Sequence, residues 1–382
     1  MIAETGLPLL RDSPVASSQV ARQKSKLPHF SELDGLRGIA AVVVFVHHFL
    51  QVAATQPTGG WNWFFRLILH LSKYGSSGVD VFFVLSGYLI TSLLLIDRGK
   101  PNYFHNFYWK RALRILPVYF VHLILTQSII GNAWGYIWLS LIFLVNFSQR
   151  FHVTTIGVAW TLSIEEQFYL IWPNFVRRLR LTSLYYLAFA LVLTSVLLRI
   201  VMPLATGGMA IIYTPYRCDG LGLGAILALQ WFEPEGRPQL IQTLLNILHS
   251  NLLLVLAIIS AAVLLCLPAE PPLIAGASIS TVNYLAYRLI RRIIRPGEPT
   301  RALTWLGHGV PVYFGKISYS LYLYHVIVLF LVTKHFGQID SSHLGQATAL
   351  FALAFGATIV MSTVSLYAME LPIQSLRRFV LK

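Results

Sequence analysis

The chain has 382 residues, of which 56% are hydrophobic and only 12% are charged. Soluble domains carry about 25% charged residues, so this composition excludes a soluble globular protein. One membrane-spanning helix needs about 20 apolar residues, and the apolar content suffices for about ten such helices. The net charge of +14 would suggest nucleic acid as the partner of a soluble chain. In a membrane protein it lies mainly in loops, so we expect an all-α polytopic integral membrane protein with no nucleic-acid partner.

Neither cysteine suggests a disulfide framework or a metal site, because Cys218 and Cys266 both lie in apolar stretches. We interpret them as packing residues. Residues 1–32 mix proline, serine and charges, which is not the pattern of a signal peptide. We expect a flexible cytosolic tail over residues 1–32, a membrane domain over 33–372 and a cytosolic C-terminal tail over 373–382.

Ten apolar runs are candidate membrane spans. They cover residues 36–55, 77–96, 113–131, 134–147, 183–203, 216–232, 250–268, 273–290, 316–335 and 345–368. An eleventh stretch, Val158 to Pro173, carries the adjacent acids Glu165 and Glu166, and we expect it to re-enter the membrane without crossing it. The polar stretch 233–249 is expected to be a loop.

The basic residues support this topology. If the eleventh stretch re-enters, one face carries the N-terminal tail, the 97–111 loop, residues 177–180, the 291–301 loop and the C-terminus. The positive-inside rule makes that face cytosolic. If the stretch crosses instead, the later basic loops fall out of register. We therefore expect about ten transmembrane helices plus a re-entrant segment, in the plasma (inner) membrane, with both termini cytosolic.

The first run contains an arginine and a histidine eleven residues apart, Arg37 and His48. At about 100° per residue they share one helix face, about 16 Å apart along the axis. With Arg37 near the cytosolic edge, His48 lies near mid-membrane, where an ionisable group is a functional candidate. Its ring could accept and return a proton. The alternative is a neutral histidine hydrogen-bonded between helices, and packing is the favoured interpretation of His47, about 80° away.

The third run begins with Arg111 and Arg114, which are neighbours on one helix face because they are three residues apart. Two guanidinium groups at a membrane edge can bind phosphate groups. The alternative is that they are ordinary anchors of the positive-inside kind, which is our interpretation of Lys110. Arg114 lies one turn deeper than an anchor needs, which favours a function.

Two further segments carry polar residues that could line a cavity. Ser86 in the second run is small enough to let a helix or a thin substrate approach, and Asp80 near its outer end could instead cap the helix. In the eleventh stretch, Ser163 and Glu166 fit a capping box, which leaves Glu165 unassigned. As helical neighbours, the two glutamates point about 100° apart and do not form a carboxylate pair.

Later in the chain, Arg217 and Asp219 stand at the start of the sixth run and could simply pair with one another. Tyr319, Tyr322 and His325 follow at i, i+3 and i+6 in the ninth run. This spacing makes a polar stripe that we expect to face the bundle interior. Packing and substrate contact are both open for that stripe.

Taken together, these segments resemble the integral-membrane acyltransferase family 3, of the O-antigen and exopolysaccharide O-acetylase type. The matching runs are LDGLRGIAA with His48, GVDVFFVLSGYLIT, RALRILPVY, WTLSIEEQFYLIWP, RCDGLGLGA and ISYSLYLYH, from about residue 33 to residue 372. The stripe around His325 lacks the tryptophan before the histidine and the proline after it that relatives often carry. The chain ends at Lys382, and the resemblance then suggests a stand-alone form without the C-terminal hydrolase-like domain of many relatives.

The resemblance implies transfer of an acyl group, commonly acetyl, from cytosolic acyl-CoA to a hydroxyl of a carbohydrate or related acceptor, often across the membrane. Acyl-CoA is then a co-substrate, and no cofactor is bound. The family's motifs map catalysis onto Arg37 and His48, and acyl-CoA binding onto Arg111 and Arg114. His48 could act as a general base or as a transient acyl carrier. The candidates for the acceptor or the cavity are Asp80, Ser86, Glu165, Glu166, Asp219, Tyr319 and His325.

Two other functions compete with this hypothesis. A transporter or flippase would use buried His, Arg and carboxylate groups as a substrate path, although no internal repeat stands out. A glycosyltransferase with a lipid-linked donor would be expected to carry a more acidic, metal-compatible loop than this sequence offers.

Overall fold

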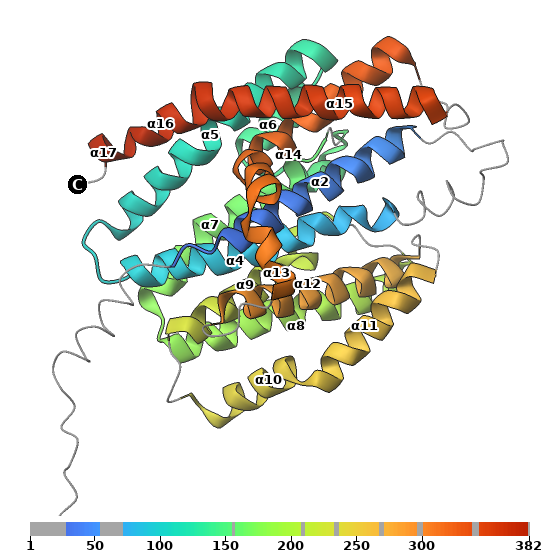
Figure 1. The fold of residues 1–382 in the computed structure, drawn as a ribbon. Coiled ribbons are helices and arrows are strands. Elements are labelled where there is room, and N and C mark those ends of the chain that lie inside the picture. The colour runs from blue at the N-terminus through green and yellow to red at the C-terminus, as the bar shows by residue number, and fades with distance from the viewer. Residues whose placement is uncertain are drawn as a thin grey trace, which may run out of the picture.

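The computed structural model describes residues 28–53, 72–154, 157–207, 211–232, 237–266, 271–295, 301–337 and 344–380, and within these ranges all regular secondary structure is helical. Most of the long helices lie side by side as a bundle (Figure 1). They are α2 (Ser31–Ala53), α4 (Gly78–Asp97), α5 (Tyr103–Ile130), α7 (Ala159–Arg178), α8 (Leu181–Thr206), α9 (Cys218–Phe232), α10 (Gln239–His249), α11 (Asn251–Cys266), α12 (Pro272–Ile294), α14 (Gly309–Phe336) and α15 (Leu344–Ser365).

Short helical elements complete the described chain. The α-helical ones are α6 (Trp134–Leu141), α13 (Arg301–Thr304), α16 (Leu371–Ser375) and α17 (Arg377–Val380). The 3₁₀ turns are η1 (Lys73–Ser77), η2 (Val145–Phe151), η3 (Thr214–Tyr216) and η4 (Trp305–Gly307), and η5 (Leu366–Glu370) is a π-helical turn. Residues 1–27 of the expected N-terminal tail lie outside the described residues. Helices α16 and α17 occupy part of the expected C-terminal tail. Helix α10 occupies residues 239–249 of the expected 233–249 loop.

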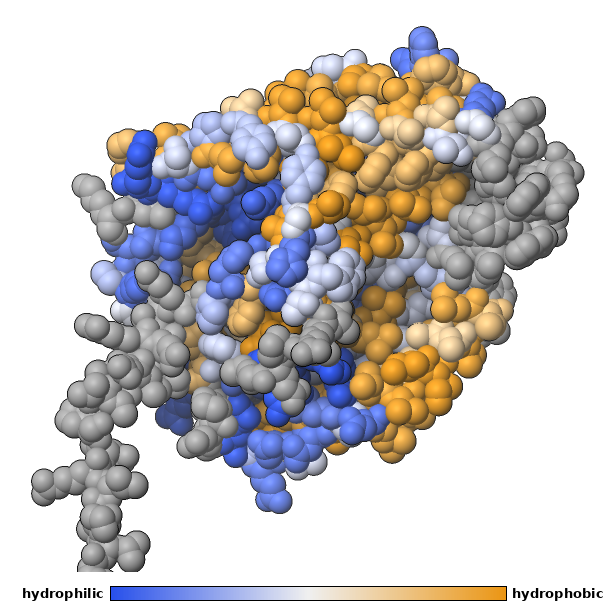
Figure 2. Space-filling model, in the orientation of Figure 1, coloured by the Kyte–Doolittle hydropathy of each residue, from blue (hydrophilic) through white to orange (hydrophobic). Residues whose placement is uncertain are grey.

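Among the described residues, six helical segments are long and apolar enough to cross a membrane, or seven if the bent pair α10–α11 counts as one span. The six are Ser31–Val52, Tyr74–Asp97, Tyr103–Ile130, Leu181–Thr206, Gly309–Phe336 and Gly345–Phe379. Large apolar side chains face outward on many helices, and Leu204 and Leu252 are each 70% exposed. Figure 2 shows such hydrophobic surface over α15 and α11. The all-α polytopic membrane fold is confirmed; the count of ten spans is not.

Two segments differ from their expected form. The expected span 134–147 contains only the eight-residue helix α6, about 12 Å long. This helix enters the bundle only to the level of Tyr119, in the middle of α5, whose hydroxyl donates to the carbonyl of Ser140 (3.0 Å). The chain then returns through η2, where the Asn146 amide donates to Thr214 in the loop between α8 and α9 (2.8 Å). Residues 134–147 therefore form a short helix and the start of a 3₁₀ turn rather than one long helix.

Residues 158–173, expected to re-enter, belong instead to the continuous 20-residue helix α7. This helix runs parallel to α4 at an almost constant register. Ser86 hydrogen-bonds Glu165, the Trp172 indole donates to Thr91 (2.9 Å), and Arg98 just beyond α4 donates to the carbonyl of Leu179 just beyond α7. Helix α7 thus extends alongside the whole of α4, although it is not among the six helical segments that are long and apolar enough to cross a membrane. Its acids and its terminal arginines lower its mean hydropathy, so hydropathy alone did not predict a 20-residue helix here.

The basic clusters meet at one end of the bundle. There α4 and α7 end and α5 begins. Helices α9 and α12 both end there, and Gln230 near the end of α9 donates to the hydroxyl of Tyr287 in α12 (2.9 Å). Helix α2 begins at the same end, because the ring of Phe30, just before α2, makes an edge contact with the ring of Trp231 at the end of α9 (6.3 Å between centroids). We call this the basic end; Figure 2 shows hydrophilic residues over it.

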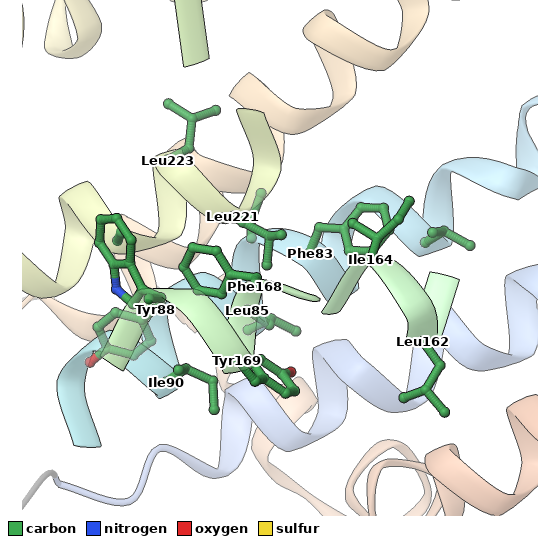
Figure 3. Packing of buried hydrophobic residues seen from close by; sticks show 14 of the residues in the cluster. Phe83, Leu85, Tyr88, Ile90, Leu162, Ile164, Phe168, Tyr169, Leu221 and Leu223 are labelled. Carbon is green, nitrogen blue, oxygen red and sulfur yellow. The ribbon is translucent and has the colours of Figure 1, made fainter. Parts of the chain in front are cut away.

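The core of the bundle depends on close approach between α4 and α9. A Cβ on Gly224 of α9 would collide with the backbone of Val84 and Tyr88, and one on Gly87 of α4 would collide with the carbonyl of Leu221. Small residues let helix backbones approach in this way within a membrane. Figure 3 shows side chains of α7 packed among those of α4 and α9. This packing fixes the position of Ser86 beside α7.

Gly224→Ala is therefore expected to destabilise the protein by about 1–3 kcal/mol, because the added methyl group meets backbone atoms that cannot rotate away. The measurement is the apparent melting temperature in detergent. Gly99→Ala is the matched control, since nothing lies within 4 Å of the position of its added methyl group. An equal melting temperature for both variants would contradict the close-packing argument.

Candidate active site

A cavity lies between α2, α4, α5, α7 and α14 and encloses about 870 Å³ of empty space, including its open mouth. Its wall combines apolar residues of α4 and α7 with polar groups from all five helices. Six of the candidate residues named from the sequence line it: Arg37, Ser86, Arg111, Arg114, Glu165 and Tyr319. These residues come from segments more than 280 positions apart in the chain, so the fold assembles them into one site.

Three arginines line the cavity near the basic end. Arg37 is paired, with its Nη1 3.2 Å from Asp34 Oδ1. Arg111 lies over the ring of Tyr169, 5.1 Å from its centroid. Within the described ranges, no carboxylate lies within ion-pair distance of Arg111 or Arg114. Two cationic groups on a cavity wall without a protein counter-ion favour an anionic ligand.

The neighbouring Lys110 differs from these arginines. Its ammonium group pairs with Asp97 (3.3 Å), which also pairs with Lys100, and it does not line the cavity. Lys110 thus lies where a topological anchor is expected, and the separation of Lys110 from Arg111 and Arg114 follows from the helical spacing of α5.

Further inside, Glu165 accepts a hydrogen bond from Ser86, and Tyr319 donates to the carbonyl of Ile115 (3.0 Å). At the inner wall the hydroxyls of Tyr322 and Thr161 are 2.8 Å apart, and Thr161 donates to the carbonyl of Val158 (2.9 Å). These contacts hold the polar groups of α7 and α14 at fixed positions around an otherwise apolar interior.

His48 lies behind this wall and does not line the cavity. The ring of Tyr322 contacts that of His325 (5.9 Å between centroids), and His325 Nε2 is 3.3 Å from His48 Nδ1. His325 is fully buried and His48 half-buried. The cavity, Tyr322, His325 and His48 therefore form a continuous row.

Backbone carbonyls fix the tautomers of both histidines. His48 Nδ1 is 2.9 Å from the carbonyl of Val44, and His325 Nδ1 is 3.2 Å from that of Leu321. A carbonyl oxygen only accepts, so each Nδ1 carries the proton and each neutral ring keeps a lone pair on Nε2. In His325 this lone pair faces His48 Nδ1–H, and in His48 it is available as a base. His47 instead hydrogen-bonds the carbonyl of Ser72, as expected of a packing residue.

The predicted pairing of Arg217 with Asp219 was wrong. Arg217 pairs with Asp80 (3.3 Å), and Asp219 pairs with Arg199, a buried residue of α8 that the sequence analysis did not single out. Asp80 therefore makes an ion pair rather than a helix cap. Neither pair lines the cavity, although the Arg217 guanidinium lies over the ring of Phe83, which does (5.5 Å).

The capping-box interpretation was also wrong. Helix α7 begins at Ala159, so Ser163 is already inside it and donates to the Ala159 carbonyl (3.3 Å). Glu166 lies outside the cavity lining, whereas Glu165 is part of it, so the two glutamates diverge as expected. The spacing of Glu165 could have identified two missed lining residues, because Thr161 and Tyr169 share its helix face at i−4 and i+4.

The fold defines a multi-pass membrane protein with an arginine-lined cavity between its helices, and comparison with known proteins gives its family. A family model described as an acyltransferase domain matches residues 30–368. The chain therefore belongs to this acyltransferase family. In the part of the chain that the structure describes, no group of three or more His, Cys, Asp or Glu residues could hold a metal ion.

Two curated relatives illustrate the similarity. "Putative peptidoglycan O-acetyltransferase YrhL" of Bacillus subtilis is 28% identical over 382 residues, which cover 90% of this chain and 54% of the relative. "O-acetyltransferase OatA" of Staphylococcus aureus is 26% identical over 376 residues, covering 90% and 57% respectively. The chain thus spans little more than half the length of these relatives. No solved structure matches it.

Proposed function

We propose that the protein is a membrane O-acyltransferase. It takes an acyl group, expected to be acetyl, from cytosolic acyl-CoA and transfers it to a hydroxyl of a carbohydrate acceptor at the far side of the membrane. The peptidoglycan saccharide in the name of the Bacillus relative is the first acceptor to test. The basic end is then the cytosolic end, in line with the positive-inside rule.

The observation that carries this proposal is a pair of arginines, Arg111 and Arg114, on the wall of a cavity that opens between five helices. Neither has a carboxylate within ion-pair distance among the described residues. The phosphates of acyl-CoA supply the missing negative charge. Arg37 flanks them, already balanced in part by Asp34. The apolar wall formed by residues such as Phe82 and Leu89 suits the thin pantetheine arm of the donor.

The acyl group then reacts at His48. As a general base, His48 Nε2 removes the proton from the acceptor hydroxyl, whose oxygen attacks the thioester carbonyl and expels the CoA thiolate. As an acyl carrier, the same lone pair attacks the thioester carbonyl and expels the CoA thiolate, and the acceptor hydroxyl then takes the acyl group from the ring and releases its proton. In either case the thioester must pass Tyr322, whose hydroxyl contact with Thr161 closes the inner wall. His325 acts as a positioning residue, since its Nε2 shares the Nδ1–H proton of His48 with the Val44 carbonyl.

Arg114→Ala is expected to raise the KM for acetyl-CoA about 30-fold, because a charge-assisted hydrogen bond contributes about 2 kcal/mol and 1.4 kcal/mol is a factor of ten. The assay measures CoA release and acetyl transfer by purified protein in liposomes. Lys110→Ala is the matched control: it removes the same charge, four residues earlier in the same helix, from a group paired with Asp97. An equal KM for both variants would remove phosphate binding by Arg114 from the mechanism. Transport of a solute with no CoA release by the wild type would favour the transporter hypothesis.

A further inference from the structure

A second hollow lies at the basic end, away from the cavity. It forms where α10 and α11 meet at a 45° bend and the end of α12 packs against them. Its lining consists of seven residues: Leu254, Leu285, Arg288, Leu289, Arg291, Arg292 and Arg295. Four of the seven are arginines and three are leucines, and the hollow encloses about 910 Å³ including its open side.

The bend is attached to α12 by polar contacts. Arg288 donates to the carbonyl of Ser250, the residue between the two helices, at 3.0 Å. The hydroxyl of Tyr284 donates to the carbonyl of Leu248 (2.9 Å), and His249 contacts the hydroxyl of Tyr287 (2.8 Å). The bond from Tyr284 satisfies a carbonyl in the last turn of α10 that has no helical partner beyond the break, and the Ser250 carbonyl also accepts from the amide of Leu254 (3.3 Å). The hollow is therefore a built feature of the fold rather than a gap between unconnected helices.

Three of the four arginines lie at i, i+3 and i+4 on one face of α12, and Arg295 follows at i+7 as the residue just after the helix. Like charges at these spacings repel one another, and the negative end of the helix dipole offsets only part of that repulsion. Within the described residues, no carboxylate lies within ion-pair distance of Arg288, Arg291 or Arg295. A bound anion would relieve the repulsion.

Topology alone does not account for this arrangement. The positive-inside rule requires arginines near the membrane surface, but it does not require them to converge on one hollow. The leucines that complete the lining belong to α11 and α12, and α11 presents exposed apolar residues such as Leu252 and Val255 around it. A ligand that fits must carry a negative charge next to an apolar chain.

We propose that this hollow binds the phosphate headgroup of an anionic phospholipid, such as phosphatidylglycerol, with the acyl chains lying along α11. The arginines pair with the phosphate, and the leucines contact the glycerol and the first methylene groups. Basic hollows between helices at the cytosolic membrane surface recognise anionic headgroups in this way. The bound lipid braces the bent pair α10–α11 against α12, independently of the cavity between α2, α4, α5, α7 and α14.

The test compares lipid binding by purified full-length protein in native mass spectrometry, with phosphatidylglycerol and phosphatidylcholine as probes. The wild type is expected to retain phosphatidylglycerol in preference to phosphatidylcholine. Arg291→Gln combined with Arg295→Gln is expected to weaken phosphatidylglycerol binding about 30-fold, because each basic group near an anionic lipid contributes roughly a factor of five. The single variant Arg295→Gln, at an exposed position, should show an intermediate loss and covers the case in which the double variant fails to fold.

The control is Arg177→Gln combined with Arg178→Gln, which removes two charges at the basic end from α7 and leaves the hollow intact. It should bind phosphatidylglycerol as the wild type does. Equal losses in the two double variants would overturn the proposal in favour of diffuse surface charge. Equal retention of the two lipids would overturn it in favour of apolar contact alone. Thermal protection by inorganic phosphate as strong as that by phosphatidylglycerol would show a free-anion site and overturn the lipid assignment.

Discussion

Replacing His48 with alanine is expected to reduce acyl transfer from acetyl-CoA by about 100- to 10,000-fold, the contribution typical of a positioned general acid–base group. The Nδ1 proton of His48 faces the Val44 carbonyl, which leaves the lone pair on Nε2, whereas the Nε2 lone pair of His325 is directed at His48. The loss should appear in kcat rather than in the KM for acetyl-CoA, because His48 lies behind the arginine-lined cavity. The measurement is acetyl transfer and CoA release by purified protein in liposomes.

His47→Ala is the matched control for this variant. It removes the same type of side chain from the adjacent position, where the ring hydrogen-bonds the carbonyl of Ser72 and contacts the ring of His48 (4.9 Å between centroids). Its kcat should change much less. Equal losses in the two variants would contradict the assignment of the base to His48. Labelled acetyl groups trapped covalently on the wild type, and absent from His48→Ala, would identify His48 as an acyl carrier rather than a general base.

Much of the fold could be predicted because a bilayer demands long apolar helices. The runs at 36–55, 77–96 and 183–203 correspond to α2, α4 and α8 within a few residues. The two segments between α5 and α8 could not be predicted, because mean hydropathy reports composition and not depth. Helix α7 is polar where it faces the cavity and yet extends alongside the whole of α4, whereas the apolar run 134–147 contains the eight-residue helix α6.

The site could be predicted in part, because helical spacing determines which side chains share a face. That reasoning separates Lys110 from Arg111 and Arg114, and Glu165 from Glu166, as the cavity lining does. It fails for contacts between helices distant in the chain. Arg217 has a carboxylate two residues away, yet its partner is Asp80, 137 residues earlier, because close packing of α4 against α9 brings the two together. No local sequence pattern shows which residues of α4 lie beside which residues of α9.

The second large effect is the loss of stability expected when Arg199 is replaced. Its guanidinium is buried and donates to both carboxylate oxygens of Asp219, to the carbonyl of Tyr216 and to Ser280 (2.9 Å). Three helices and one turn are thereby connected through a single side chain: α8, α9, α12 and η3. Arg199→Met leaves the Asp219 carboxylate buried without its partner, so the expected loss of stability is about 3–5 kcal/mol. The measurement is thermal unfolding in detergent, together with the folded yield.

Lys100→Met is the matched control, because it breaks an ion pair with Asp97 in which the lysine side chain is 56% exposed, and such pairs contribute at most about 1 kcal/mol. Adding Asp219→Leu to Arg199→Met should restore part of the stability, since the uncompensated charge is then gone. Similar melting temperatures for Arg199→Met and Lys100→Met would contradict the structural role of the pair. A further variant, Asp219→Asn, tests the acceptor role considered for Asp219. A purely structural pair predicts that the folded fraction of Asp219→Asn keeps its kcat and KM, whereas a folded Asp219→Asn protein with a raised KM for the saccharide alone would place the acceptor beside Asp219.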